Sequence, residues 1–377
     1  MKAVIAAYAR TPFHFARKGA LAEVRPDTLA AQAVSGLLAR TDLDPALIED
    51  VILGCAYPEA SQGNNLARIV CLLAGLPQAV GGMTVNRFCG SSMQAVHIAA
   101  AQIEAGMGEA FLCVGVESMT MVPQGGFNFS PNPGLLANTS AYLSMGETAE
   151  NVAARWNVNR ADQEALAVES HRKAAAARAE GRLADEIIPV RLANGDVIDA
   201  DGCIRPATSL EALAGLKPAF RPDGVVTAGT ASPLTDGAAV VLVTSDAFAE
   251  QHGLAPMARV RSFATVGVDP AIMGIGPIPA TRKALARAGL TVADLDVVEI
   301  NEAFSSQALA CIRDLGLDPA TVNLDGGGLA IGHPLGATGA RITGKAAALL
   351  VRENGRYALS TQCIGGGQGI ATVLERV

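Results

Sequence analysis

The segment VNRFCGSSMQA, residues 85–95, decides how the rest of the chain is interpreted. An apolar run ending at Val85 predicts a strand, and the Ala-rich run that starts after Cys89 predicts a helix. A cysteine at that junction lies at the positive end of a helix, where backbone N–H groups favour the nucleophilic thiolate. The alternative is a small apolar residue buried at the end of a strand, the usual position of a free cysteine. The segment alone leaves both interpretations open.

The composition predicts a large α/β protein with a core of small residues. The 377 residues are 50% hydrophobic but only 4% aromatic, so Ala, Val, Leu and Ile must fill the interior. Such packing suits sheets that helices cover closely. The length exceeds that of a typical single domain and predicts two or three.

The charge and the cysteines exclude several classes of partner. A net charge of −7, from 36 acidic and 29 basic residues, argues against nucleic acid, because neutralising phosphates needs a concentrated basic face. We expect no signal peptide, because the first residues are strand-like, and no membrane span, because no apolar stretch is long enough. The seven cysteines form no C-x-x-C pair, so we expect free thiols and no metal site. These features predict a cytoplasmic protein.

Strand–helix alternation in the first part of the chain predicts a sheet covered by helices. Helical patterns occupy residues 28–40, with Asp27 as the N-cap, and residues 64–74. Apolar runs predict strands over residues 4–8, 51–56, 83–85 and 111–116. This spacing favours a parallel or mixed sheet.

Residues 118–234 interrupt the alternation. Proline and glycine punctuate the stretch before residue 146, which predicts irregular structure there. Two helices, at residues 146–157 and 160–180, precede a polar segment from 185 to about 222. A surface excursion without a task is one interpretation, but the length favours a binding or lid element.

From residue 258 the first pattern recurs. Helices are predicted at residues 279–289, 302–316 and 338–354, and strands at 258–265, 297–300, 321–324, 356–362 and 370–376. Two similar halves place equivalent loops on one side of the molecule. We therefore expect one active site built from both halves.

Three further motifs lie in this second half, at strand ends or between elements. They are NEAF (residues 301–304), GGGLAIGHPLGATG (residues 326–339) and CIGGGQG (residues 363–369). Glycines at this density allow positive φ and close approach of the backbone to a ligand. Taken alone, His333 is more often a structural hydrogen-bonding residue, and Cys363 a buried apolar one. The glycine loop lacks the spacing of a dinucleotide site.

Together and in order, NRFCGS (residues 86–91), NEAF, GHP (residues 332–334) and CIGG (residues 363–366) resemble the motifs of thiolases across essentially the whole chain. The resemblance is nearest to the 3-ketoacyl-CoA thiolases of fatty-acid β-oxidation. It implies the thiolase fold, with two duplicated α/β halves in five αβαβα layers and an inserted loop domain. The implied domains are residues 1–117 completed by 235–254, the CoA-binding loop domain 118–234, and residues 255–377.

The resemblance also implies catalytic roles. Cys89 would attack the 3-keto carbonyl after His333 takes its proton, and Cys363 would protonate the departing acetyl-CoA enolate. Asn301 would hold a water at the thioester oxygen, and the N–H groups of Cys89 and Gly365 would bind the acyl oxyanion. Ketoacyl synthase relatives commonly carry a second histidine instead, so Cys363 favours thiolase chemistry.

Coenzyme A is the implied co-substrate, without a permanently bound cofactor or a metal. The residues expected to bind it are Arg205 on the adenine side, Leu216 lining the pocket, and Ala228, Gly229 and Ser232 along pantetheine. The implied partners are 3-ketoacyl-CoA and further copies of the chain in a homodimer or homotetramer, alone or with a hydratase–dehydrogenase α subunit.

Two alternatives stay open. A biosynthetic acetoacetyl-CoA thiolase would use the same residues for condensation, although Ser144 stands where some short-chain thiolases carry histidine. A thiolase-like protein could also bind lipid or CoA without turnover. The presence of Cys89, His333 and Cys363 together argues against that second alternative.

Overall fold

A ten-stranded mixed sheet runs through the computed structural model, which describes residues 2–377. Its strands follow the order β10-β11-β12-β9-β1-β8-β5-β3-β4, and β2 pairs with β8 beside this path. They are β1 (Ala3–Arg10), β2 (His14–Phe15), β3 (Asp50–Gly54), β4 (Gly81–Val85), β5 (Ala110–Ser118), β8 (Thr235–Ser245), β9 (Ala258–Gly267), β10 (Val297–Ile300), β11 (Tyr357–Ile364) and β12 (Gln368–Arg376). A separate ribbon pairs β6 (Val190–Arg191) with β7 (Val197–Ile198).

The two halves of the large sheet repeat one topology. In the first half β8 runs antiparallel to both β1 and β5, and β3 is parallel to β5 and β4. In the second half β12 runs antiparallel to both β9 and β11, and β10 is parallel to β11. The first strands of the two halves, β1 and β9, pair with each other and join the half-sheets. This repeat is the predicted duplication.

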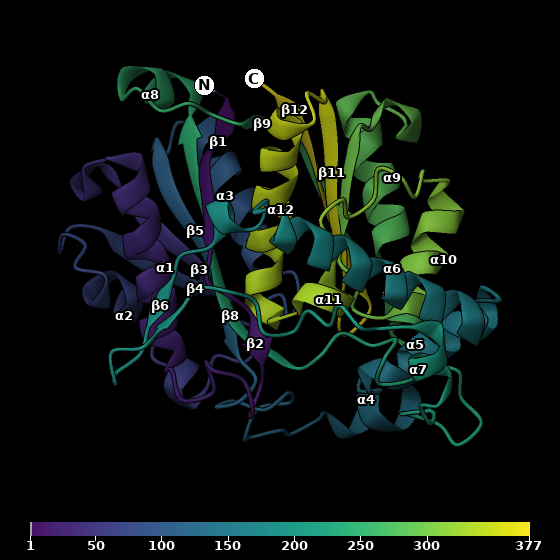
Figure 1. Cartoon of the computed structure of the whole chain (residues 1–377). Coiled ribbons are helices and arrows are strands. Elements are labelled where there is room, and N and C mark those ends of the chain that lie inside the picture. Colours follow the sequence, from purple (N-terminus) through teal and green to yellow (C-terminus); the bar gives the residue numbers. More distant parts are fainter. Residues whose placement is uncertain (1) are drawn as a thin grey trace.

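Helices form three layers around the two half-sheets (Figure 1). The helices are α1 (Pro26–Thr41), α2 (Leu66–Leu73), α3 (Ser91–Glu104), α4 (Pro133–Asn138), α5 (Met145–Arg155), α6 (Arg160–Ala179), α7 (Leu210–Ala214), α8 (Asp246–Gln251), α9 (Pro277–Ala288), α10 (Ser305–Leu315), α11 (Gly328–Ile331) and α12 (Leu335–Arg352). Short 3₁₀ helices are η1 (Pro45–Leu47), η2 (Ala60–Gln62), η3 (Ala184–Glu186), η4 (Pro270–Ile275) and η5 (Val292–Asp294). α1 and α2 cover the outer face of the first half, α9 and α10 that of the second, and α3 and α12 lie between the half-sheets. The five layers agree with the predicted fold class.

Alternation along the strands divides the core between these layers. On β8, Val241 belongs to the central apolar cluster with Val96 of α3, whereas its neighbour Val240 belongs to the outer cluster with Leu29 of α1. Successive strand residues point to opposite faces of a sheet, so a strand covered on both faces is apolar throughout. Such strands account for the many small aliphatic residues of the chain.

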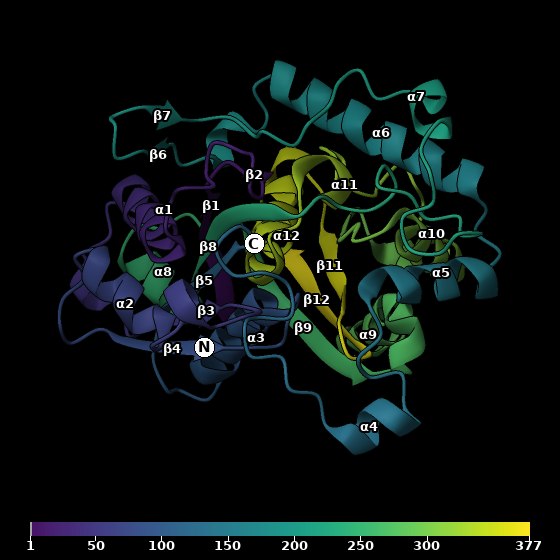
Figure 2. The ribbon, with the colours of Figure 1, turned by 90° about the horizontal axis from the view of Figure 1, so that it is seen from below.

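The chain between β5 and β8 forms an excursion over one end of the sheet. Its longest helix, α6, packs on α10 and α11, and Figure 2 shows this helix beside them while α4 projects from the body. The helix α4 occupies part of the stretch expected to be irregular, so that expectation was wrong for residues 133–138. Asn132 caps it by accepting hydrogen bonds from the first N–H groups.

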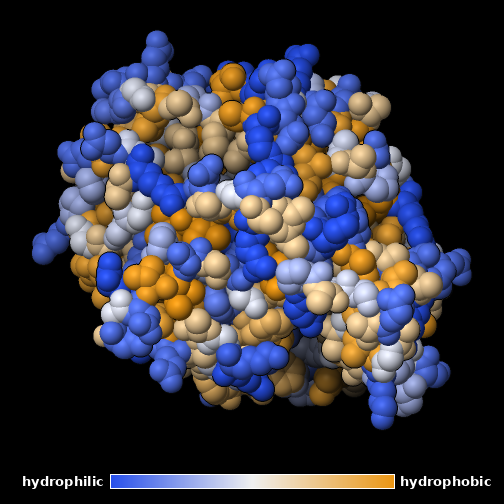
Figure 3. All heavy atoms as spheres, viewed as in Figure 1, coloured by the Kyte–Doolittle hydropathy of each residue, from blue (hydrophilic) through white to orange (hydrophobic). Residues whose placement is uncertain are grey.

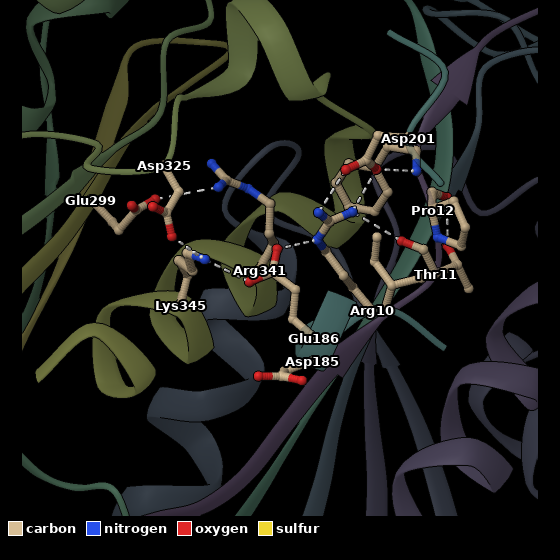
Figure 4. A network of polar contacts seen from close by, with 12 residues as sticks. Arg10, Thr11, Pro12, Asp185, Glu186, Asp201, Glu299, Asp325, Arg341 and Lys345 are labelled. Atoms are coloured by element: carbon tan, nitrogen blue, oxygen red, sulfur yellow. Dashed lines mark hydrogen bonds and ion pairs between the residues drawn. The ribbon is translucent and has the colours of Figure 1, made fainter. Parts of the chain in front are cut away.

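Buried ion pairs fasten this excursion to both halves (Figure 4). Arg10 of β1 bonds Glu186 at 2.7 Å and Asp201 at 2.7 Å, two carboxylates of the excursion. Lys345 of α12 bonds the same Glu186 at 2.8 Å and Asp325 at 2.7 Å. We call Arg10, Glu186, Asp201, Asp325 and Lys345 the buried network. It joins residues that are far apart in the sequence.

Two local predictions were wrong. Helix α1 begins at Pro26 with Arg25 as its N-cap, so Asp27 lies inside the first turn. Proline suits the first helical position because its φ is already helical and its missing N–H is not needed there. Residues 321–324 form only one bridge to β10, because the side chain of Asn323 bonds the backbone N and O of Ile300 at 2.9 and 3.0 Å.

No helix within residues 2–377 is long and apolar enough to cross a membrane. On the face shown in Figure 3, hydrophobic residues lie in small groups among hydrophilic ones.

Candidate active site

Cys89 lies in a tight turn between β4 and α3. Phe88, just before it, has a φ of 43°, in the left-handed region that costs a non-glycine residue about 1–3 kcal/mol. The Ser91 side chain holds the turn, since its Oγ donates to the Phe88 carbonyl at 2.6 Å and accepts from Arg87 N at 2.9 Å. The turn therefore places Cys89 directly before the N-terminus of α3.

His333 occupies the matching position before α12. Gly332 precedes it with a φ of 112°, a backbone conformation that residues other than glycine rarely adopt. The His333 backbone N donates to Thr235 Oγ1 at 3.1 Å, and the residue is 4% exposed. Cys89 and His333 each stand two residues before the first residue of a central helix.

The first turn of α3 touches the second turn of α12, and this contact brings the two halves together. Ala340 N donates to Ser92 Oγ at 2.8 Å. A Cβ on Gly339 would lie 2.3 Å from the backbone N of Met93, so α12 can approach α3 this closely only at a glycine. Cys89 also packs in one apolar cluster with Leu335, the first residue of α12. The structure thus brings the Cys89 and His333 turns to one place.

The turn after β11 supplies the second cysteine. Cys363 is 1% exposed, and both its burial and the neighbouring Cys89 raise its pKa well above the ordinary thiol value. The backbone N–H of Gly365 lies near enough to the Cys89 sulfur to lower its pKa, and Gln362 Nε2 donates to the Cys89 carbonyl. Residues 362–365 therefore face Cys89 across the interface between the halves.

Asn301 completes the group at the end of β10. Its backbone N donates to the Thr361 carbonyl at 3.0 Å, which ties it to β11. Its Nδ2 lies 3.3 Å from His333 Nε2, and its buried Oδ1 has no hydrogen-bond partner among the described residues. The five residues expected to be catalytic thus converge from both halves.

Burial keeps the two central side chains neutral at rest. Burial raises the pKa of Cys89 to about 12, although the N–H of Gly365 lowers it. Burial, and then the charge of Arg341, lower the pKa of His333 to about 3. The backbone N–H groups act on Cys89 in the expected direction, but the cost of desolvation exceeds the stabilisation that they give the thiolate.

Thr338 fixes which ring nitrogen of His333 can accept a proton. Its Oγ1 donates to the Pro334 carbonyl at 3.0 Å and lies 2.6 Å from His333 Nδ1. Because the single hydroxyl proton is used on the carbonyl, Oγ1 must accept from Nδ1–H. The imidazole then has its lone pair on Nε2, which is the nitrogen available as a base.

The residues expected to bind CoA lie along the excursion. Gly229 packs against Leu213 and Leu216, since a Cβ there would lie 2.5 and 2.8 Å from their side chains. The Ser232 N donates to the Ala303 carbonyl at 3.0 Å, beside Asn301, while Ala228 is exposed. Arg205 does not share these contacts. Its backbone N donates to Nδ1 of His171 in α6, and its guanidinium carbon lies 5.9 Å from the centroid of the Phe15 ring.

Three residues near this group had no role assigned from the sequence. Glu117, Thr338 and Gln362 are all buried. A carboxylate ending the apolar run of β5 was a usable signal for Glu117, since buried acids need partners. Gln362 gave no such signal, because its partner is the distant carbonyl of Cys89. Thr338 gave none, because a threonine inside a helix ordinarily bonds only the carbonyl four residues earlier. Residues 2–377 hold no cluster of three or more His, Cys, Asp or Glu side chains suited to a metal ion.

Known proteins match the chain over its full length. The model of the thiolase N-terminal domain matches residues 3–247, and that of the thiolase C-terminal domain matches residues 254–376. Curated proteins named 3-ketoacyl-CoA thiolase from Shewanella denitrificans, Shewanella putrefaciens and Shewanella baltica are each 50% identical over 388 aligned positions, covering 100% of both chains. By domain models, by similarity and by fold, the chain belongs to the thiolase family.

Proposed function

We propose that the protein is a 3-ketoacyl-CoA thiolase, which uses CoA to cleave a 3-ketoacyl-CoA into acetyl-CoA and a shortened acyl-CoA. The observation that carries this proposal is the pairing of two thiols, the partly exposed Cys89 and the buried Cys363, beside a neutral imidazole. Carbon–carbon cleavage needs a nucleophile for the carbonyl and a separate acid for the departing carbanion. The printed names of the 50% identical relatives support the same reaction.

In the first half-reaction, His333 Nε2 takes the Cys89 proton as the sulfur attacks the 3-keto carbonyl carbon. The oxyanion faces the N–H groups of Cys89 and Gly365, and its collapse breaks the C2–C3 bond and leaves acyl-Cys89. The electron pair passes to the acetyl-CoA enolate, whose carbon takes the Cys363 proton. The enolate oxygen is stabilised by the His333 Nε2–H and by a water that Asn301 holds. Each oxyanion donor of this kind is worth about 10²–10³ in rate.

In the second half-reaction, the proton on His333 restores the Cys363 thiol as acetyl-CoA leaves. His333 then takes the proton of an incoming CoA thiol, whose sulfur attacks acyl-Cys89. The carbon–sulfur bond to Cys89 breaks, and its thiolate receives the proton from His333. Every proton and electron pair is returned, so the enzyme needs no permanently bound cofactor.

The excursion supplies the CoA site in this proposal. Ala228, Gly229 and Ser232 contact pantetheine, with Leu216 behind Gly229 and Arg205 on the adenine side. The contacts of Gly229 with Leu216 and of Ser232 with Ala303 support the inner part of this path, which leads toward Asn301.

The proposed setting is fatty-acid β-oxidation in the cytoplasm. The seven free cysteines suit a reducing compartment. We propose a homodimer or homotetramer, alone or with a hydratase–dehydrogenase α subunit. Light scattering of the purified protein, alone and mixed with such a subunit, tests both assemblies.

The chain-length profile of thiolysis tests the proposal. Purified protein is given CoA and 3-ketoacyl-CoA substrates from C4 to C16, and acetyl-CoA formation is measured. Activity on C8–C16 supports the degradative role, whereas activity confined to C4 supports the biosynthetic alternative. The Cys89→Ser variant is the control for background thiolysis.

Labelling with acetyl-CoA tests whether the protein turns over at all. The wild-type protein is mixed with acetyl-CoA and its peptides are analysed by mass spectrometry. An acetyl group on Cys89 supports the acyl-enzyme. Absence of the adduct, together with no thiolysis at any chain length, would leave a protein that binds lipid or CoA without turnover.

A further inference from the structure

A buried carboxylate without a role in the proposed chemistry ends β5. Glu117 is 0% exposed and receives N–H donors on both oxygens. Oε2 accepts from the backbone N of Ala56 at 2.8 Å and of Gly336 at 2.9 Å. Oε1 accepts from Gln62 Nε2 at 2.8 Å and from Tyr57 N at 3.3 Å. The Cys55 thiol also donates to Oε1, at 3.6 Å, so all five partners are donors, which is the set that an ionised carboxylate takes. Burial raises the pKa of Glu117, and the hydrogen bonds from Ala56, Gln62, Gly336 and Tyr57 oppose that rise.

These donors belong to opposite sides of the active site. Ala56 and Tyr57 lie in the same apolar cluster as Cys89. Gly336 is instead the second residue of α12, three residues after His333. The N-cap of α12 is Pro334, whose side chain has no oxygen to accept from the first N–H groups of the helix. Glu117 therefore accepts from one of these N–H groups, that of Gly336. A negative charge is also favourable at that end of a helix.

Glycines make this contact possible. A Cβ on Gly115 would lie 2.3 Å from the Gly336 carbonyl oxygen, and a Cβ on Gly336 would lie 2.5 Å from the Val116 carbonyl oxygen. Both gaps are too small for any side chain. The backbone of β5 therefore touches the first turn of α12, and Glu117 connects the two at this point.

We propose that Glu117 is a positioning residue whose carboxylate holds the first turn of α12, and with it the His333 imidazole, in place against the Cys89 turn. This inference rests on the proposed function, because it concerns the proton transfer between Cys89 and His333. Glu117 does not touch the reacting atoms. It acts through the backbone of both turns.

The charge of Glu117 also acts on Cys89. After burial, which is the largest cause, this charge contributes to the raised pKa of the Cys89 thiol. Four other titratable groups face Glu117 or Cys89: Cys55, Tyr57, Cys363 and His333. All four are uncharged at neutral pH, because burial raises the pKa of the two thiols and the phenol and lowers that of the imidazole. Removing the charge of Glu117 should therefore make the thiolate of Cys89 easier to form.

Two substitutions separate position from charge. Glu117→Gln replaces one acceptor oxygen by a donor that faces other donors, so kcat of thiolysis should fall by about 10²-fold with KM for CoA within about twofold. Alkylation of Cys89 by iodoacetamide, measured without substrate, should begin at lower pH. Glu117→Asp keeps the charge but shortens the reach, so kcat should fall while the alkylation profile stays in place.

The matched control is Glu186→Gln, the same change in a buried carboxylate of the network. It should lower stability but leave kcat within about twofold and the alkylation profile unmoved. Glu117→Gln with wild-type kcat, or with a kcat loss no larger than that of the control, overturns the proposal. An alkylation profile that does not move in Glu117→Gln also overturns it.

Two further measurements keep the test decisive. If neither Glu117 variant folds, Gln62→Met removes one partner of the carboxylate and should lower kcat by about tenfold; an unchanged kcat overturns the proposal. If the wild-type protein thiolyses no substrate, the proposed function fails, whereas the alkylation comparison still tests the link between Glu117 and Cys89.

Discussion

Replacing Lys345 by methionine should destabilise the protein more than any surface ion pair could. The Lys345 ammonium lies 2.8 Å from Glu186 and 2.7 Å from Asp325, and its side chain is 5% exposed. Methionine fills a similar volume but leaves two buried carboxylates short of one positive charge. Removing one partner of a buried ion pair costs about 3–5 kcal/mol.

The pH dependence of this loss follows from the carboxylates. Burial alone would raise the pKa of Glu186, but Lys345 and Arg10 outweigh it and lower that pKa. Arg352 and Lys345 likewise outweigh burial at Asp325. Carboxyl groups with lowered pKa stabilise the fold at pH above their ordinary values and lose that contribution as pH falls. Without Lys345 these pKa values rise, so the difference between variant and wild type should be largest near pH 7 and shrink toward pH 4.

Urea unfolding followed by circular dichroism, at one protein concentration and at several pH values, measures this loss. The control is Arg282→Met, which removes an exposed pair with Asp314 at 2.7 Å and should cost about 0–1 kcal/mol. A loss at Lys345 no larger than that of the control would refute the reasoning. So would a loss that grows as the pH falls.

Three further predictions concern the active site. Cys363→Ala should still accept an acyl group on Cys89 from an activated thioester but should stall carbon–carbon cleavage; equal loss of both half-reactions, measured separately, would contradict the acid role. Thr338→Val should lower kcat by about tenfold or more, because the His333 Nδ1–H loses its acceptor and the proton is no longer held on Nδ1. Thr338→Ser keeps the hydroxyl and should keep most of the activity, and steady-state kinetics would measure both effects. Because burial lowers the pKa of His333 to about 3, the plot of kcat/KM against pH should show no acid limb near pH 6.5. The folded state should lose stability as the pH falls below about 6.5, because there only the unfolded chain takes up a proton on this histidine.

The regular elements were largely predictable, because two-sided burial leaves a strong pattern. β5 is buried at every position, and its continuous apolar run at residues 111–116 predicted the strand. β8 is buried throughout as well, but residues 235–245 were not predicted as a strand. Residues 321–324 also have a strand-like pattern, but Asn323 takes the hydrogen bonds that the ladder would have made. When a side chain takes the place of a backbone partner, the pattern of apolar residues does not change. The pattern alone therefore could not have corrected this prediction.

The charged interior was not predictable from local patterns. Arg341 and Lys345 lie on α12, where charged residues would ordinarily mark a solvent-facing side, yet both are at most 4% exposed. Their partners, Glu299 for Arg341 and Glu186 for Lys345, are 42 and 159 residues away in the chain. Only the tertiary arrangement makes such charges compatible with the core.

The duplication explains how the candidate site forms, and burial explains why the proposed nucleophile, Cys89, is a neutral thiol without substrate. Equivalent turns before α3 and α12 carry different residues, so one repeated backbone supplies a thiol from one half and a base from the other. Burial disfavours both the thiolate of Cys89 and the imidazolium of His333. Proton transfer between the two is therefore costly until a carbonyl group can take up the negative charge beside the N–H of Gly365. The proposed mechanism therefore has attack and proton transfer occur together.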